Sequence, residues 1–104
     1  MNIALSDMDL AAFEARAADA AGLLKMLANE RRLMILCKLI EAGEMNVSRL
    51  SEAVGLSQSA LSQHLAKMRE ENLIAFRREA QTLFYRVSDP NVARLLSILK
   101  SIFC

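Results

Sequence analysis

The sequence predicts a mainly α-helical domain with a small β-hairpin, and three observations lead to this fold class. Apolar residues recur at helical spacing along most of the chain, which contains only three Gly and one Pro. Near the middle, a short helical segment, a turn containing Gly55 and a second helical segment follow one another directly. After them, two short segments rich in β-branched and aromatic residues indicate strands, and the chain then returns to helical spacing.

Length and charge restrict the class of protein further. The 104 residues carry 13 Lys and Arg against 12 Asp and Glu, a net charge of +1, unlike a disordered tail or a highly basic chromatin protein. We expect one domain over residues 1–104, and a chain this short gains core by associating with a second copy. No apolar run approaches the roughly 18 residues of a membrane span, and the first residues lack a signal-peptide pattern. The sequence predicts a cytoplasmic protein without a membrane partner.

The first expected helix covers residues 6–24. Its apolar residues recur at helical spacing: Leu10, Phe13, Ala17, Ala20 and Leu24. Ser6 and Asp9 have the spacing of a capping box, and the many alanines would let another helix approach closely. A second helix, from Asn29 as its N-cap to residue 40, is apolar on nearly every side, which is typical of a central helix.

The middle of the chain contains two further helices and the hairpin. A short helix from about residue 47 to 54 ends at Gly55, and Ser57 is placed as the N-cap of a helix that runs to about residue 71. That longer helix has an apolar face at the spacing i, i+4, i+7: Leu61, Leu65 and Met68. The two expected strands, residues 73–78 and 82–87, form the hairpin.

Asp89 followed by Pro90 predicts the start of a last helix over residues 89–103. Its apolar residues form one stripe that continues to the end of the helix. The complete order is four helices, a two-stranded hairpin and one helix (ααααββα). This is the order of a winged helix-turn-helix, in which the hairpin is the wing.

The helix after the turn is the candidate for reading DNA. The side opposite its apolar face displays Ser59, Ser62, Gln63, Ala66 and Lys67, with Gln58 and His64 at the flanks. Amides and hydroxyls can hydrogen-bond base edges, and a lysine can neutralise a phosphate. Any solvated helix face is polar, but no acidic residue lies between Ser57 and Arg69. This absence favours DNA binding, because a carboxylate there would repel the phosphate backbone.

Three arginines, Arg77, Arg78 and Arg86, lie on the expected wing. Side chains alternate along a strand, so at least one of them would reach a neighbouring phosphate or the minor groove. A charged hairpin is also simply soluble, so this signal is weaker than that of the helix. We take Arg77 and Arg78 as candidate DNA contacts.

Three runs of the sequence resemble one bacterial family. They are Met26-Leu-Ala-Asn-Glu-Arg-Arg-Leu-Met-Ile-Leu36, a run from Leu50 to Arg69 that includes Leu56-Ser-Gln-Ser-Ala-Leu-Ser-Gln-His-Leu65, and Leu83-Phe-Tyr-Arg-Val87. They are similar to the ArsR/SmtB family of dimeric winged-helix repressors, and the likeness covers nearly the whole chain. It implies a homodimer built on the first and last helices, double-stranded operator DNA as partner, and release when an inducer is sensed. The expected dimer residues are Leu10, Phe13, Ala17, Leu95, Leu99 and Ile102.

Two metal sites found in that family are missing here. Where its arsenic and cadmium sensors carry a Cys-Val-Cys type motif, this chain reads Asn46-Val-Ser48. Its zinc sensors carry an Asp-x-His pair and a later His-x-x-Glu on the last helix, whereas this chain has Asp89-Pro-Asn91 and no later His or Glu. A tetrahedral site within one protomer is therefore poorly supplied, although a two-thiol site shared across a dimer stays open. We expect no cofactor and no metal.

The two cysteines are Cys37, in the expected central helix, and Cys104, at the end of the last one. In a reducing compartment such distant thiols are reduced, ligating or redox-active rather than permanently bridged. They resemble the thiol pair of the family's sulfide- and persulfide-responsive branch, the biofilm growth-associated repressor type. The resemblance implies reactive sulfur species as the inducer, which join the thiols by a disulfide or a polysulfide and lower DNA affinity. Without the resemblance, Cys37 is interpreted as a buried small hydrophobe among apolar side chains, and Cys104 as an unconstrained terminal residue.

Two other functions stay open on the sequence alone. One is a metal-responsive ArsR-type repressor in which the cysteines are incidental, and the other is a winged helix used only as a protein-interaction module. Catalysis is not expected, because no nucleophile–base–acid set, metal-hydrolase spacing or phosphate loop appears.

Overall fold

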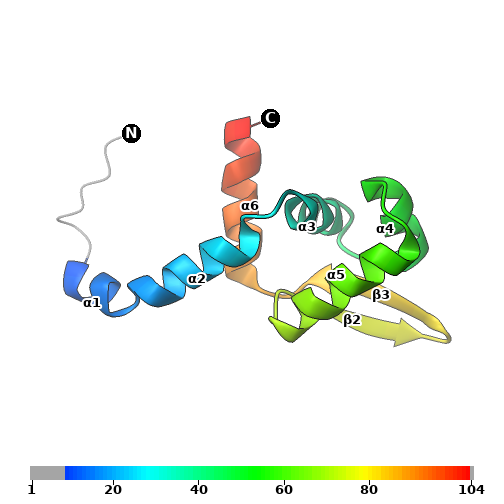
Figure 1. The fold of residues 1–104 in the computed structure, drawn as a ribbon, viewed down its shortest axis with the longest axis horizontal. Coiled ribbons are helices and arrows are strands. Elements are labelled where there is room, and N and C mark those ends of the chain that lie inside the picture. Colours follow the sequence, from blue (N-terminus) through cyan, green and yellow to red (C-terminus); the bar gives the residue numbers. More distant parts are fainter. Residues whose placement is uncertain (1–8, 104) are drawn as a thin grey trace.

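The computed structural model describes residues 9–103, which form six α-helices and a three-stranded antiparallel sheet (Figure 1). This arrangement confirms the predicted fold class. The largest fully buried side chains come from α3, α4, α5, α6, the first residue of β2 and the residue before it: Ile35, Leu36, Leu39, Leu50, Leu61, Leu65, Met68, Leu73, Ile74 and Val92. Among the described residues, no helix is long and apolar enough to cross a membrane.

The N-terminal helix differs from the prediction, because it is divided into α1 (Leu10–Ala15) and α2 (Ala17–Leu27). Arg16 leaves the helical conformation (φ −115°, ψ 10°) and is both the C-cap of α1 and the N-cap of α2. The expected cap Ser6 lies outside the described residues, and Asp9 caps α1 instead, accepting from the Ala12 N–H at 3.1 Å. In Figure 1, α1 and α2 extend away from the other elements.

The central helix α3 (Glu30–Ala42) begins as predicted, since the Asn29 side chain accepts from the Arg32 N–H at 3.1 Å. One face of the helix is buried through Ile35, Leu36 and Leu39. The opposite face leaves Met34, Cys37 and Ile40 exposed. The helix is therefore central, as predicted, but the expectation that Cys37 is buried among apolar side chains is wrong. The sequence shows that these residues are apolar but not which of them finds a neighbour.

The helix-turn-helix comprises α4 (Val47–Val54) and α5 (Gln58–Glu70). Gly55 ends α4 in the left-handed conformation (φ 69°), which favours glycine. The turn is tied to α4 because the Ser51 carbonyl accepts from the N–H groups of Gly55 and Leu56, and the Ser51 hydroxyl donates to the Leu56 carbonyl. Ser57 caps α5 as predicted, accepting from the Ala60 N–H at 3.1 Å.

The sheet has the strand order β1-β3-β2 and is therefore larger than the predicted hairpin. The hairpin strands are β2 (Ile74–Glu79) and β3 (Thr82–Val87), with Phe76 opposite Tyr85 and Arg77 opposite Phe84. The additional strand, β1 (Met45–Asn46), pairs with β3. The sequence missed it because two residues are too few to show alternation, and only the pairing defines the strand.

The last helix, α6 (Pro90–Phe103), begins after Asp89, whose carboxylate accepts from the Asn91 N–H at 2.9 Å. It packs on α3 and β3 and buries Val92 and Leu96. In Figure 1 the axis of α6 runs crosswise to the axis of α2. The cap and the apolar stripe therefore confirm the predicted helix, and one side of the stripe supplies the core.

Candidate nucleic-acid interface

The side of α5 that we predict to contact DNA is positioned by three fully buried side chains on the opposite side of the helix, Leu61, Leu65 and Met68. We call the outward side the recognition face. Because these anchors are held by the core, the opposite side of the helix must face outward. The residues predicted to contact DNA lie on this outward side and its flanks, and His64 among them is half-buried. The others are exposed: Gln58, Ser59, Ser62, Gln63 and Lys67. The helix therefore presents amides, hydroxyls and one lysine without a carboxylate among them.

Gln58 is oriented by the neighbouring helix of the motif. Its side-chain nitrogen donates to the Ser48 hydroxyl in the first turn of α4, at 3.2 Å. The amide carbonyl oxygen is left to accept from a base edge or a water. The sequence drew attention to Ser48 only as the place of an absent metal ligand, and nothing in its spacing from Gln58 predicted this contact.

The wing arginines lie on different sides of the sheet. Arg77 lies on the outer side, where its guanidinium stacks over the Phe84 ring at 4.5 Å from the centroid. It pairs with Glu44 at 2.6 Å and with Glu79 at 2.8 Å. These hydrogen bonds lower the pKa of the Glu44 carboxyl and raise the pKa of Arg77. Arg77 is therefore held by two carboxylates and is less available to a phosphate.

Arg78 lies on the other side of β2, which also carries Phe76. It is exposed, and neither Arg78 nor Arg86 forms a salt bridge within residues 9–103. Arg69, at the end of α5, stacks over the Phe76 ring at 4.7 Å and so links the recognition helix to the wing. Of the two predicted wing contacts, Arg78 is the better placed for DNA.

The described residues contain no group of three His, Cys, Asp or Glu side chains that could hold a metal ion. Cys37 is exposed on the face of α3 that also carries Met34 and Ile40. Cys104 lies outside the described residues. The predicted pairing of these two thiols therefore stays a prediction.

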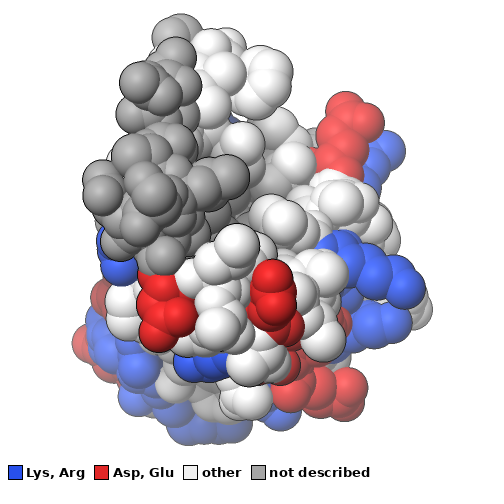
Figure 2. Space-filling model, turned by 90° about the vertical axis from the view of Figure 1, so that its left-hand side faces the viewer, with Lys and Arg blue, Asp and Glu red and all other residues white. Residues whose placement is uncertain are grey.

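The N-terminal helices and α6 carry a second set of exposed side chains, which are apolar. On α1, α2 and α6, large hydrophobic side chains are about half exposed or more: Leu10, Phe13, Leu24, Ile98, Ile102 and Phe103. Of the other predicted dimer residues, Ala17 is exposed, while Leu95 and Leu99 are half-buried against the core. Figure 2 views the end of the molecule that carries α1, where uncharged surface lies among scattered acidic and basic residues. An apolar surface of this kind is typical of an interface.

Comparison with known proteins agrees with this geometry. The sequence profile described as "Bacterial regulatory protein, arsR family" matches residues 29–75. Transcriptional activator HlyU of Vibrio cholerae is 47% identical over 97 residues, covering 93% of this chain and 89% of the relative. The biofilm growth-associated repressor of Agrobacterium fabrum is 41% identical over 100 residues, covering 96% and 85%. The crystal structure of the transcriptional repressor BigR from Xylella fastidiosa superposes with a TM-score of 0.85 at 39% identity, covering 93% and 98%. Two of the three are named as transcriptional regulators, and the third is named as a repressor.

Proposed function

Because the chain belongs to the arsR family of bacterial regulatory proteins, we propose that it is a cytoplasmic repressor that binds operator DNA as a homodimer and is released by reactive sulfur species. The observation that carries the DNA-binding part is the outward face of α5, which is rich in hydrogen-bonding groups and free of carboxylates. We propose repression because biofilm growth-associated repressors stand among its relatives, whereas the relative HlyU is named as an activator.

In the proposed complex, α5 lies in the major groove. Gln58 and Gln63 hydrogen-bond base edges, the hydroxyls of Ser59 and Ser62 add adaptable contacts, and His64 lies at the edge of the face. Lys67 at the end of the helix and Arg78 on the wing neutralise phosphates on either side. The two tasks, reading bases and holding the backbone, thus fall to different residues.

The proposed dimer joins the apolar surfaces of α1, α2 and α6 in two copies of the chain. Leu10, Phe13 and Ile102 are all about half exposed or more in the single chain, and burial against a partner would remove this area from water. A shallow groove on the same surface, between α1 and α2, is lined by Ala12, Phe13, Arg16, Asp19, Ala20 and Leu23. A two-fold dimer matches an operator with two inverted half-sites.

The proposed inducer step uses the two thiols and an organic persulfide. A Cys37 thiolate attacks the outer sulfur of the persulfide, gains that sulfur and releases the organic thiol. The Cys104 thiolate then attacks the inner sulfur of the Cys37 persulfide and displaces hydrosulfide, which leaves a disulfide. The exposure of Cys37 supports its role as the first nucleophile, because the oxidant must reach it.

Selection from random duplexes tests the proposal. The reduced protein is incubated with duplexes that carry a random central sequence, and the bound duplexes are amplified and sequenced. We expect an inverted repeat whose half-site centres are about 10 base pairs apart. Treatment with a persulfide donor should then release that duplex, whereas treatment with the corresponding reduced thiol alone should not. If no sequence is enriched, the proposed DNA recognition is wrong. If a selected duplex stays bound after persulfide treatment, the proposed inducer is wrong.

A further inference from the structure

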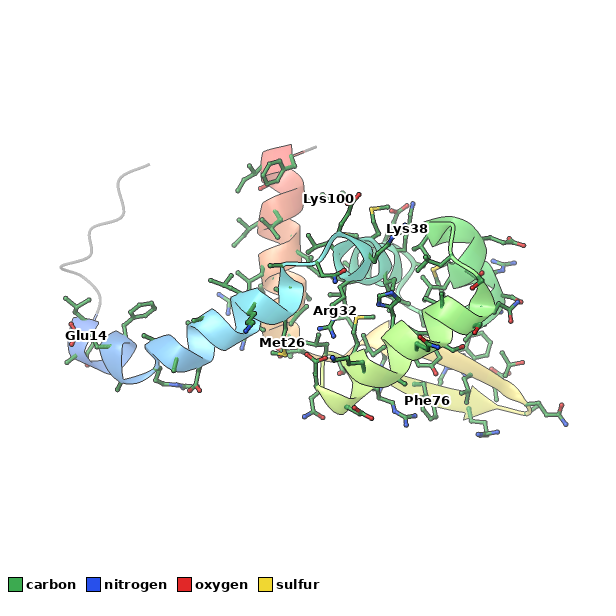
Figure 3. The ribbon with its side chains drawn as sticks, viewed as in Figure 1. Glu14, Met26, Arg32, Lys38, Phe76 and Lys100 are labelled. Atoms are coloured by element: carbon green, nitrogen blue, oxygen red, sulfur yellow. The ribbon has the colours of Figure 1, made fainter. Side chains whose placement is uncertain are left out.

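A nearly buried arginine joins the start of the central helix to the end of the recognition helix. Arg32, in the first turn of α3, pairs with Glu71 through two hydrogen bonds, Nη1–Oε2 at 3.1 Å and Nη2–Oε1 at 2.7 Å. Its Nη1 also donates to the Met26 carbonyl, near the end of α2, at 3.1 Å. Figure 3 shows Arg32 close to Met26, in the region where α2, α3 and α5 approach one another. We call Arg32, Glu71 and the Met26 carbonyl the Arg32 clasp.

The clasp is shielded from solvent. The side chains of Arg32 and Glu71 are only 11% and 23% exposed. Their hydrogen bonds raise the pKa of Arg32 and lower the pKa of Glu71, so both groups are charged over the physiological range. A two-pronged pair of a planar guanidinium and a carboxylate fixes orientation as well as distance, which a single hydrogen bond or a lysine does not.

Glu71 lies at a position from which the clasp can affect the orientation of the recognition helix. Glu71 is the C-cap of α5, and Asn72 after it takes a positive φ of 62° as the chain turns toward β2. The recognition helix otherwise packs mainly on α4 and β2. Through the clasp, its end is also held to α3 and to the end of α2, the helix that continues into the apolar surface proposed as the dimer interface.

We propose that Arg32 and Glu71 are positioning residues that set the angle of the recognition helix relative to the dimer interface, and thereby the half-site spacing that the dimer accepts. This inference rests on the proposed function. The 13 residues of α5 span about 20 Å, so a tilt of about 10° displaces one end relative to the other by roughly 3 Å. That displacement is about the rise of one base pair. If the clasp is weakened, the dimer should therefore no longer prefer one distance between the half-sites.

The chain offers a matched control for the test. Glu70 is the neighbour of Glu71, is exposed, and forms no salt bridge within the described residues. Glu71→Gln and Glu70→Gln each remove one negative charge from the same end of the recognition helix. Both changes raise non-specific DNA affinity to a similar extent, because the phosphates are repelled less. Only Glu71→Gln weakens the clasp.

The experiment measures the binding of each variant to a panel of duplexes. The panel holds the inverted repeat that the wild type selects, the same repeat with its spacer shortened or lengthened by one and two base pairs, and a scrambled duplex. We expect the ratio of affinities for the selected and the altered spacings to fall roughly tenfold in Glu71→Gln. This is about the effect of one mismatched base pair. Glu70→Gln should keep the wild-type spacing profile.

Arg32→Lys tests the clasp from its other side and keeps the charge. It should broaden the spacing profile in the same direction, and thermal melting followed by circular dichroism separates this effect from unfolding. If Glu71→Gln and Arg32→Lys remain folded and keep the wild-type profile, the clasp does not position the helix. If the wild type itself selects no repeat, the DNA-binding proposal fails and the clasp fails with it.

Discussion

At the scale of single residues, the proposed interface assigns base reading and phosphate binding to different residues. Gln63 projects from α5 away from its buried anchors, and an amide contact to a base edge contributes about 1 to 3 kcal/mol of discrimination. We therefore expect Gln63→Ala to weaken binding to the selected duplex about 5- to 150-fold more than binding to a scrambled duplex. Competition titrations with both duplexes measure this difference. Equal losses on the two duplexes would contradict base reading by Gln63.

The two neighbouring wing arginines should behave differently. Arg78 is exposed and forms no salt bridge within residues 9–103, whereas Arg77 is held by Glu44 and Glu79. Arg78→Ala should weaken binding to any duplex and reduce the slope of log K against log salt concentration by about one. Arg77→Ala should leave that slope nearly unchanged, because its charge is already paired. The opposite result, a change of slope for Arg77→Ala alone, would mean that Arg77 exchanges its carboxylates for a phosphate on binding.

At the scale of elements, glycines in two places should respond to the same substitution with opposite signs. Gly55 ends α4 with a φ of 69°, whereas Gly22 lies within α2, and an added Cβ would meet nothing within 4 Å at either position. Gly55→Ala should therefore destabilise the protein by about 1 kcal/mol through backbone strain alone. Gly22→Ala should stabilise it by about 0.5 to 1 kcal/mol, because alanine is the better helix former. Chemical denaturation of both variants measures the two signs, and a Gly55→Ala protein as stable as the wild type would contradict the strain.

The elements also show which structural features a sequence can reveal. Asn29, Ser57 and Asp89 were predicted as caps, and each accepts backbone hydrogen bonds at its helix start. These features are local, since a cap and its partner lie within three residues of each other. The strands β2 and β3 were predicted to within one residue of their bounds for the same reason.

Features that depend on distant partners were missed. Strand β1 is defined only by its pairing with β3, and Arg77 is held by Glu44, 33 residues earlier in the chain. The Arg32–Glu71 pair bridges 39 residues. The exposure of Cys37 was missed because helical spacing separates an apolar face from a polar one but cannot rank two apolar faces. The outward polar face of α5 was predictable because its buried anchors and its polar side lie on one continuous helix.

At the scale of the whole molecule, the dimer should depend on the exposed apolar stripe of α6. Ile102 is 65% exposed in the single chain, so Ile102→Asp should leave the fold intact while placing a charge in the proposed interface. We expect a dimer for the wild type and a monomer for this variant in sedimentation velocity at micromolar concentration. Ser97→Asp is the matched control, because Ser97 is exposed on α6 about 140° around the helix from Ile102. A wild-type monomer, or an Ile102→Asp dimer, would contradict this interface.

The two thiols should act together as a switch of the whole molecule. Cys37→Ser and Cys104→Ser should each bind the selected duplex like the reduced wild type, because neither position belongs to the recognition face of α5. Each variant should also stay bound after persulfide treatment, because a covalent link needs both sulfurs. Fluorescence anisotropy of the labelled duplex before and after treatment measures the release, and mass spectrometry of the treated wild type should detect a Cys37–Cys104 link with or without additional sulfur.

The energetic demand on this switch is large, and a covalent bond can meet it. Reversing a 99:1 preference for the DNA-bound state needs a differential of about 10⁴, roughly 5.5 kcal/mol, between the two conformations. A link between Cys37 on α3 and the end of the chain beyond α6 would act on the surface that the proposed dimer shares. The recognition helices of the two protomers must lie about one DNA turn apart, so a shift of that surface changes the distance on which binding depends. A treated wild type without the link, or a single-cysteine variant that is still released, would show that the cysteines are incidental.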